Sequence, residues 1–71
     1  MFYYKTDAGT FWIKQESNGR WTLRLNGEAL GSYNSPEQAA DDVYMQATGS
    51  YEWDSKDEIL EPTDLGEWNY S

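Results

Sequence analysis

The sequence predicts a small α+β domain in which one helix packs on one face of a three- or four-stranded antiparallel meander. Turn signals recur at short intervals, at 7–9, 17–19 and 26–27, and the segments between them are rich in aromatic and β-branched residues. A segment with a strong helix-start signal follows near residue 35. Residues 51–71 are both acidic and aromatic, and we expect this C-terminal segment to fold back on the domain.

The central hairpin has a register that can be argued from its two faces. A three-residue loop at 17–19, with Gly19 left-handed, puts Phe11 and Ile13 on the same face as Leu23 and Leu25. A two-residue turn at 18–19 would mix charged residues with the core. The three-residue loop also sets Trp12 opposite Arg24 and Lys14 opposite Thr22 on the other face. The expected strands are 2–6, 10–16, 20–25 and 28–33.

The two remaining turns differ in how firmly they fix a register. Asn26 and Gly27 suit a two-residue type I′ turn, which sets Leu30 opposite Leu23. The first turn leaves two alternatives open. A three-residue loop at 7–9 places Phe2 and Tyr4 on the Trp12 face, whereas a two-residue turn at 8–9 places them on the opposite face.

The helix start is the clearest local signal in the chain. Ser35 is the expected N-cap, Pro36 occupies the first helical position, and Gln38 completes a capping box. The helix is expected over 36–47, with Gly49 ending it. Its apolar stripe consists of Ala39, Ala40, Val43, Tyr44 and Ala47.

The C-terminal segment combines charge with apolar area. Residues 51–71 hold seven of the thirteen acidic residues and one basic residue, Lys56, together with Trp53, Leu65 and Trp68. This apolar content is too high for a segment that stays disordered. The alternation at 51–54 predicts a short extended piece. We expect the segment to cover the sheet face that carries Trp12, Lys14 and Arg24.

Length and composition exclude several function classes. A chain of 71 residues forms one domain, here 1–50 for the meander and helix plus the acidic segment 51–71. The chain has no histidine and no cysteine, so the usual general bases, nucleophiles and thiolate ligands are absent. The carboxylates at 54, 57, 58 and 61 match no EF-hand spacing. We expect no enzyme activity, no cofactor and no metal site.

Net charge points to the partner class. At a formal −8, the chain is expected to disfavour nucleic acid and anionic membranes, because binding to both depends on lysine and arginine. Without a membrane-length apolar run or a signal-peptide pattern, a monomeric cytoplasmic protein is expected. The predicted function is a non-enzymatic interaction domain that meets a basic protein surface. The candidate partner-binding residues are Asp41, Asp42, Asp57, Glu58 and Trp68.

The alternative function places the binding site on the opposite sheet face. Trp12, Lys14 and Arg24 could stack and neutralise single-stranded nucleic acid. In this alternative the acidic segment regulates the face, as a removable lid or a mimic of DNA phosphates. The two hypotheses make opposite demands on residues 51–71.

Two resemblances accompany these features. The run WTLRLNGEALGSYNSPEQAA at 21–40 resembles the core of the plant ethylene-response-factor type of DNA-binding domain. That family binds DNA through the sheet face away from its helix, where Arg20, Arg24 and Trp12 would lie here. Most of the chain is similar to small acidic bacterial proteins of uncharacterised function, through LGSY at 30–33, SPEQAADD at 35–42 and the pattern of Pro62, Asp64, Leu65 and Trp68. This second resemblance implies that 51–71 belongs to the domain.

Overall fold

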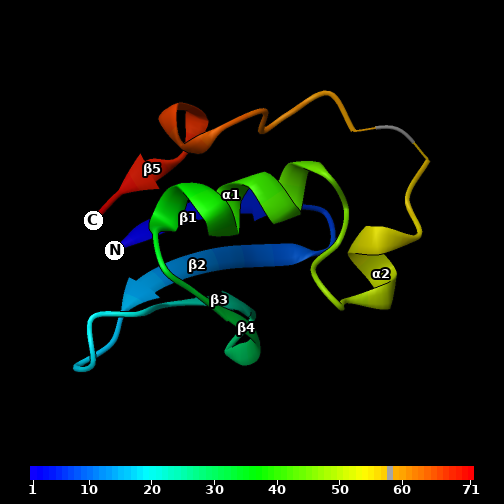
Figure 1. Cartoon of the computed structure of the whole chain (residues 1–71). Coiled ribbons are helices and arrows are strands. Elements are labelled where there is room, and N and C mark those ends of the chain that lie inside the picture. The colour runs from blue at the N-terminus through cyan, green and yellow to red at the C-terminus, as the bar shows by residue number, and fades with distance from the viewer. Residues whose placement is uncertain (58) are drawn as a thin grey trace.

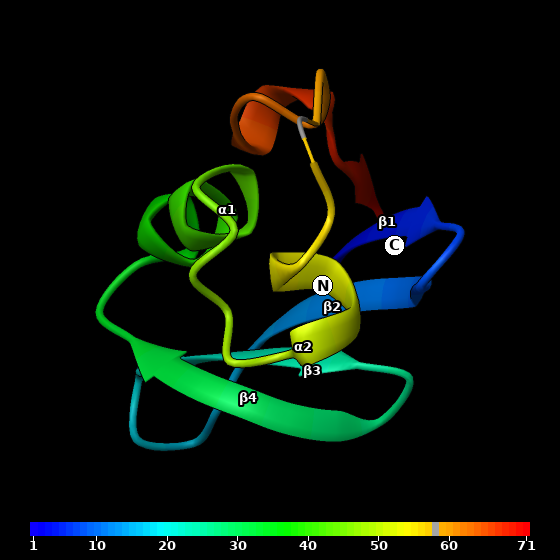
Figure 2. The same ribbon diagram turned by 90° about the vertical axis from the view of Figure 1, so that its right-hand side faces the viewer.

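The computed structural model describes residues 1–57 and 59–71, which form one antiparallel sheet with the helices on one side (Figure 1, Figure 2). The strand order is β4-β3-β2-β1-β5. The helices are α1 (Pro36–Tyr44), α2 (Tyr51–Asp54) and the 3₁₀ turn η1 (Leu65–Glu67). The strands are β1 (Phe2–Thr6), β2 (Gly9–Gln15), β3 (Trp21–Leu25), β4 (Glu28–Tyr33) and β5 (Asn69–Tyr70). The predicted α+β class, with the C-terminal segment folded back, is confirmed, and that segment adds the fifth strand.

The core lies between the sheet and the helices. Strands β2 and β3 supply alternate side chains to it, and α1 contributes its small residues, which let the helix sit close to the sheet. Two tryptophans of the C-terminal segment complete the core. Its buried members are Phe11, Ile13, Leu23, Leu25, Ala39, Ala40, Val43, Trp53 and Trp68.

The central hairpin has the predicted register. Phe11 lies opposite Leu25 and Trp12 opposite Arg24. The loop is three residues long, since the Glu16 N–H donates to the Arg20 carbonyl at 2.7 Å, and Gly19 has a φ of +85°. A left-handed backbone conformation at this position favours glycine, because glycine has no Cβ to clash.

The first hairpin places Phe2 opposite Ile13 and Tyr4 opposite Phe11, on the core face. This is the facing expected from a two-residue turn, although the turn residues are 7–8 and not 8–9. The Thr6 hydroxyl fixes the turn by donating to the Gly9 carbonyl at 2.7 Å and accepting from the Ala8 N–H at 3.1 Å.

The turn between β3 and β4 is confirmed, but the register beyond it is not the predicted one. Asn26 and Gly27 have φ of +52° and +90°, as a type I′ turn requires. A bulge between Leu23 and Arg24 then sets Leu23 opposite Gly31, so the predicted Leu30 partner is wrong. The extra residue turns Tyr33 to the helix side, where its hydroxyl donates to Asp42 Oδ2 at 2.7 Å.

The helix start is confirmed and the helix end is corrected. The Ser35 hydroxyl accepts from the Gln38 N–H at 3.3 Å, as an N-cap does, whereas Gln38 Oε1 accepts from the Asn34 N–H at 3.2 Å and not from the Ser35 N–H of the predicted capping box. Helix α1 ends at Tyr44, and the left-handed residue that terminates it is Gln46, with a φ of +56°, and not Gly49. The Ala47 N–H donates to the Asp42 carbonyl at 2.9 Å, which closes a Schellman motif.

Gln46 is held in this left-handed conformation by hydrogen bonds to residues seven and ten positions further along the chain. The Gln46 side-chain amide donates to the carbonyls of Trp53 at 3.2 Å and Lys56 at 2.8 Å. These bonds join the end of α1 to α2 and offset the backbone strain. They also explain why the helix is shorter than its apolar pattern predicted: Tyr44 and Ala47 are exposed.

Residues 51–54 form one helical turn and not the predicted extended piece. The Asp54 carboxylate folds back to the loop before α2, accepting from the Thr48 N–H, the Thr48 hydroxyl and the Gly49 N–H at 2.8–3.1 Å. This local capping closes the turn, which an alternating pattern of four residues does not reveal. Trp53 is thereby directed inward.

The C-terminal segment packs on the helix side, so the prediction that it covers Trp12, Lys14 and Arg24 is wrong. The Trp53 ring meets Phe11 edge-on at 5.0 Å, and its Nε1 donates to the Val43 carbonyl at 2.8 Å. Trp68 packs near Tyr4 and Phe11. Helix α1 contacts β2, β3 and β4 but not β1, so the core face of β1 and the adjoining part of β2 needs these rings. None of the described helices is long and apolar enough to span a membrane.

Candidate functional site

The described charges are unevenly placed: most acidic residues lie with the helices, whereas four of the five basic residues lie in or next to the strands, together with Asp7, Glu16 and Glu28. The helices and the loops joining them carry the acidic residues Glu37, Asp41, Asp42, Glu52, Asp54, Asp57, Glu61, Asp64 and Glu67, with Lys56 as the basic residue. The other four basic residues are Lys5, Lys14, Arg20 and Arg24, in or next to the strands. By strand alternation they lie on the outer face of the sheet, which α1 does not cover.

The acidic side has a groove between α1 and the segment that leads into η1. It encloses about 380 Å³, and every charged residue that lines it is acidic. Helix α1 contributes Glu37 and Asp41 from successive turns, and Asp64 faces them from the other wall. The complete lining is Glu37, Gln38, Asp41, Thr63, Asp64 and Leu65. We call this the acidic groove.

Hydrogen bonds fix the wall opposite α1. Asp64 caps η1, because its Oδ1 accepts from the Gly66 N–H at 2.9 Å. Glu67 reaches back to Thr63, accepting from its N–H and, at 2.9 Å, from its hydroxyl. These bonds to Thr63 hold the pKa of Glu67 below its usual range. The hydrogen bonds therefore hold both wall carboxylates, Asp64 and Glu67, in place.

The predicted partner-binding residues separate into distinct environments. Asp41 is exposed and lines the acidic groove, and Asp57 is exposed on the loop after α2. Asp42 accepts the Tyr33 hydroxyl and is half-buried; burial and this carboxylate raise the pKa of Tyr33. Trp68 is 7% exposed, so its predicted place on a partner surface is wrong. Glu58 lies outside the described residues.

A second groove, which we call the β1 groove, lies between the end of β1 and the loop after α2. It encloses about 500 Å³ and is lined by Tyr4, Lys5, Thr6, Asp7, Trp53, Lys56, Asp57, Ile59, Leu60 and Glu61. No local sequence pattern indicates this groove, because its two walls are about fifty residues apart in the chain.

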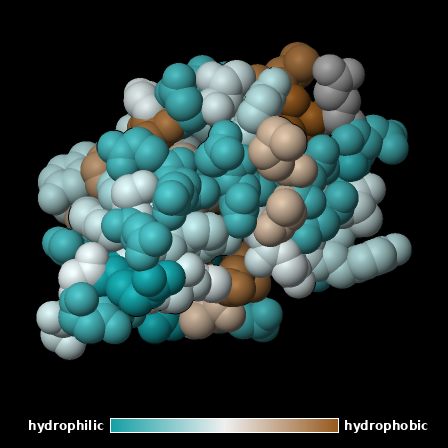
Figure 3. Space-filling model, viewed as in Figure 1, coloured by the Kyte–Doolittle hydropathy of each residue, from teal (hydrophilic) through white to brown (hydrophobic). Residues whose placement is uncertain are grey.

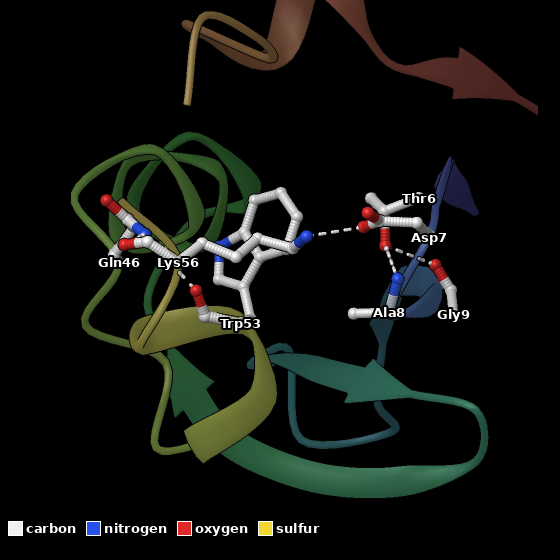
Figure 4. Close-up of polar contacts among 7 residues, drawn as sticks. All are labelled: Thr6, Asp7, Ala8, Gly9, Gln46, Trp53 and Lys56. Atoms are coloured by element: carbon white, nitrogen blue, oxygen red, sulfur yellow. Dashed lines mark hydrogen bonds and ion pairs between the residues drawn. The ribbon is translucent and has the colours of Figure 1, made fainter. Parts of the chain in front are cut away.

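An ion pair bridges the two walls of the β1 groove. The Lys56 side chain runs past the Trp53 ring, with its Nζ 5.9 Å from the ring centroid, and reaches Asp7 Oδ1 at 2.6 Å (Figure 4). The hydrogen bond and charge of Lys56 lower the pKa of Asp7. Burial, with the negative charge of Glu61 as a further cause, raises the pKa of Tyr4.

The outer sheet face brings Trp12, Lys14 and Arg24 together as predicted. The centroid of the Trp12 ring lies 5.0 Å from that of Tyr3, a residue that was not among those predicted for this face. Arg24 donates to the Gly27 carbonyl at 3.1 Å and lies 3.8 Å from Glu16. Lys14 is exposed. None of the described helices crosses this face.

The carboxylates of the acidic side are spread and do not converge. Within 1–57 and 59–71, no three potential metal ligands lie close enough together to hold an ion. Comparison with known proteins gives no further guide: no family model, curated protein or solved structure matches this chain. The arrangement favours several separate contacts to basic side chains over a single coordinated cation.

Proposed function

We propose that this protein is a non-enzymatic interaction domain that binds a basic surface of another protein through its acidic helical side. The observation that carries the proposal is the acidic groove, whose walls carry Glu37, Asp41 and Asp64 with no basic residue among the lining. Lysine or arginine side chains of the partner would enter this groove. The guanidinium group suits it best, because it can bridge two carboxylates at once.

The expected binding is steered by charge and sensitive to salt. Glu37, Asp41 and Asp64 are exposed, and exposed ion pairs contribute about 0–1 kcal/mol each, so several must act together. A net charge of −8 raises the association rate with a basic partner at low ionic strength. Leu65 on the groove wall adds an apolar contact that salt does not screen.

Capture from a native lysate followed by mass spectrometry tests the proposal. The bait pair is the wild-type chain and the triple variant Glu37→Gln, Asp41→Asn, Asp64→Asn, which keeps the side-chain acceptors while removing three charges. A control, Glu16→Gln with Glu28→Gln, removes two acids from the strand region. We expect a basic protein to be captured by the wild type and the control and lost from the triple variant. Equal capture by all three would contradict the proposal.

The outer sheet face supports a second candidate, single-stranded nucleic acid. The observation that favours it is the position of the C-terminal segment, which packs on the helix side and leaves Trp12, Lys14 and Arg24 uncovered by the described helices. Aromatic rings among basic residues can stack bases. Fluorescence titration with random single-stranded oligonucleotides tests it. Micromolar binding with a steep salt dependence that Trp12→Ala abolishes would favour this candidate over the first.

A further inference from the structure

Strand β1 has an edge that β5 covers only in part. The two strands pair at Phe2 and Tyr3, and the Ser71 N–H donates to the Met1 carbonyl at 2.9 Å. Backbone groups of alternate residues point to the same edge of a strand. The groups of Met1 face the C-terminal strand, so those of Lys5 point to the same edge. No described backbone group pairs with Lys5 on that side.

The β1 groove adjoins this open edge. Tyr4, Lys5 and Thr6 form one wall, and Ile59 and Leu60 lie on the other. Leu60 is 80% exposed, which is unusual for a leucine in a chain with so little aliphatic surface. A hydrophobic patch stands out over the loop after α2 in an otherwise largely hydrophilic view (Figure 3). The groove therefore offers apolar contacts beside unpaired main-chain groups.

The charges around the groove suit a basic occupant. Asp57 and Glu61 are exposed at its rim, and Lys56 is engaged by Asp7. The side chain of Lys5 alternates with that of Tyr4 and belongs to the outer sheet face. Two rim carboxylates thus remain beside the edge without a described ion-pair partner in their own chain.

We propose that an extended basic peptide of the partner protein adds to the β1 edge at Lys5 as a further strand. Its main chain would bond to the Lys5 N–H and C=O, and one apolar side chain would enter the groove against Tyr4 and Leu60. Basic residues next to that side chain would meet Asp57 and Glu61. Strand addition gives affinity through the main chain and specificity through alternate side chains. The inference rests on the proposed function and names the form in which the partner binds.

Nuclear magnetic resonance on the ¹⁵N-labelled whole chain tests it, with the peptide acetyl-Lys-Val-Lys-Val-Lys-Val-amide as probe. We expect saturable shifts centred on Lys5, with the Lys5 amide moving downfield and exchanging at least tenfold more slowly with solvent. A version of the peptide methylated on its backbone nitrogens cannot donate these bonds and should bind at least tenfold more weakly. Shifts that leave Lys5 unmoved, or equal binding of the methylated peptide, would overturn the proposal.

A matched pair of surface variants separates the groove from general charge attraction. Leu60→Ser should weaken the peptide at least fivefold, whereas Tyr51→Ser, at a residue 83% exposed outside the groove, should leave it unchanged. Both residues are exposed enough for either variant to fold. Equal effects of the two variants would overturn the proposal.

The triple variant of the acidic groove distinguishes this inference from the function on which it rests. That variant should lose the captured partner but keep most of its affinity for the peptide, because its three changes lie outside the β1 groove. Partner capture that survives Leu60→Ser, with no shift at Lys5, overturns strand addition and leaves the proposed function standing. The same conclusion follows if the triple variant loses the partner while Leu60→Ser still captures it.

Discussion

The two faces of the sheet each carry large aromatic side chains, yet only one face is covered. On the helix side, Trp53 and Trp68 are 3% and 7% exposed and complete the core with Phe11. On the outer face, Trp12 is half-buried beside Tyr3 and among basic residues. The difference shows that the C-terminal segment serves packing. Charge does not attract it to the basic face, because covering apolar area on β1 and β2 contributes more than exposed ion pairs do.

The largest expected effect separates the two faces directly. Trp68→Ala should destabilise the domain by about 3–5 kcal/mol, the usual range for a buried tryptophan, against a total stability of about 5 kcal/mol. Trp12→Ala on the outer face should cost about 1 kcal/mol, since its ring is only half-buried. Thermal unfolding followed by circular dichroism measures both. A Trp12 variant less stable than the Trp68 variant would reverse the comparison.

Gln46 tests whether the C-terminal segment also fixes the end of α1. Gln46→Ala removes two hydrogen bonds to the Trp53 and Lys56 carbonyls and keeps a left-handed non-glycine residue, so a loss of about 1–3 kcal/mol is expected. Gln46→Gly loses the same bonds but relieves the backbone strain, and should be about 1 kcal/mol more stable than the alanine variant. Urea unfolding compares them. Two variants of equal stability would show that Gln46 is not strained.

The separation of contacting residues along the chain explains which parts of the structure the sequence could predict. The N-cap of α1 and the turn of the central hairpin depend on residues a few positions apart, as Ser35 with Gln38 and Ser17 to Gly19 show, so these two features were predictable. The position of the C-terminal segment depends on which strands α1 leaves uncovered on the core face, and that is known only once the helix is placed on the sheet. Trp53 was a recognisable anchor, but its partner Phe11 was expected beneath the helix alone.

The candidate site likewise contains residues that could be predicted from the sequence and residues that could not. Asp41 could be found as an exposed helix acid, and the grouping of Trp12, Lys14 and Arg24 followed from the central register. Asp64, on the opposite wall of the acidic groove, joins Asp41 only through the path of the C-terminal segment. The bulge that turns Tyr33 toward Asp42 could not be expected from the turn at 26–27, because one extra residue changes the facing of every residue after it.

The helix cap is a smaller test on the covered side. Ser35→Ala should cost about 1 kcal/mol, because it removes the acceptor for the Gln38 N–H. Ser17→Ala, in the exposed loop of the central hairpin, is the control and should change the melting temperature little. If both variants melt alike, Ser35 does not stabilise α1.

The ion pair across the β1 groove should give the smallest effect, through pH. The pKa of Asp7 is lower in the folded state, so its contribution is present above the unfolded pKa of about 4 and is lost as pH falls through the folded value. Carboxyl chemical shifts should show Asp7 titrating below ordinary aspartates, and Lys56→Met should return it to about 4. An Asp7 titration that Lys56→Met leaves unchanged would mean that the pair does not form in solution.

The central claim is that the C-terminal segment packs on the helix side and leaves the outer sheet face open. Nuclear Overhauser contacts of the Trp68 indole test it most directly, because they report distances below about 5–6 Å. The structure predicts cross-peaks from the Trp68 ring protons to those of Tyr4 and Phe11, whose ring centroids lie 5.8 and 6.3 Å away. Cross-peaks to Trp12 or Arg24 in place of these, or no long-range contacts from Trp68, would contradict it.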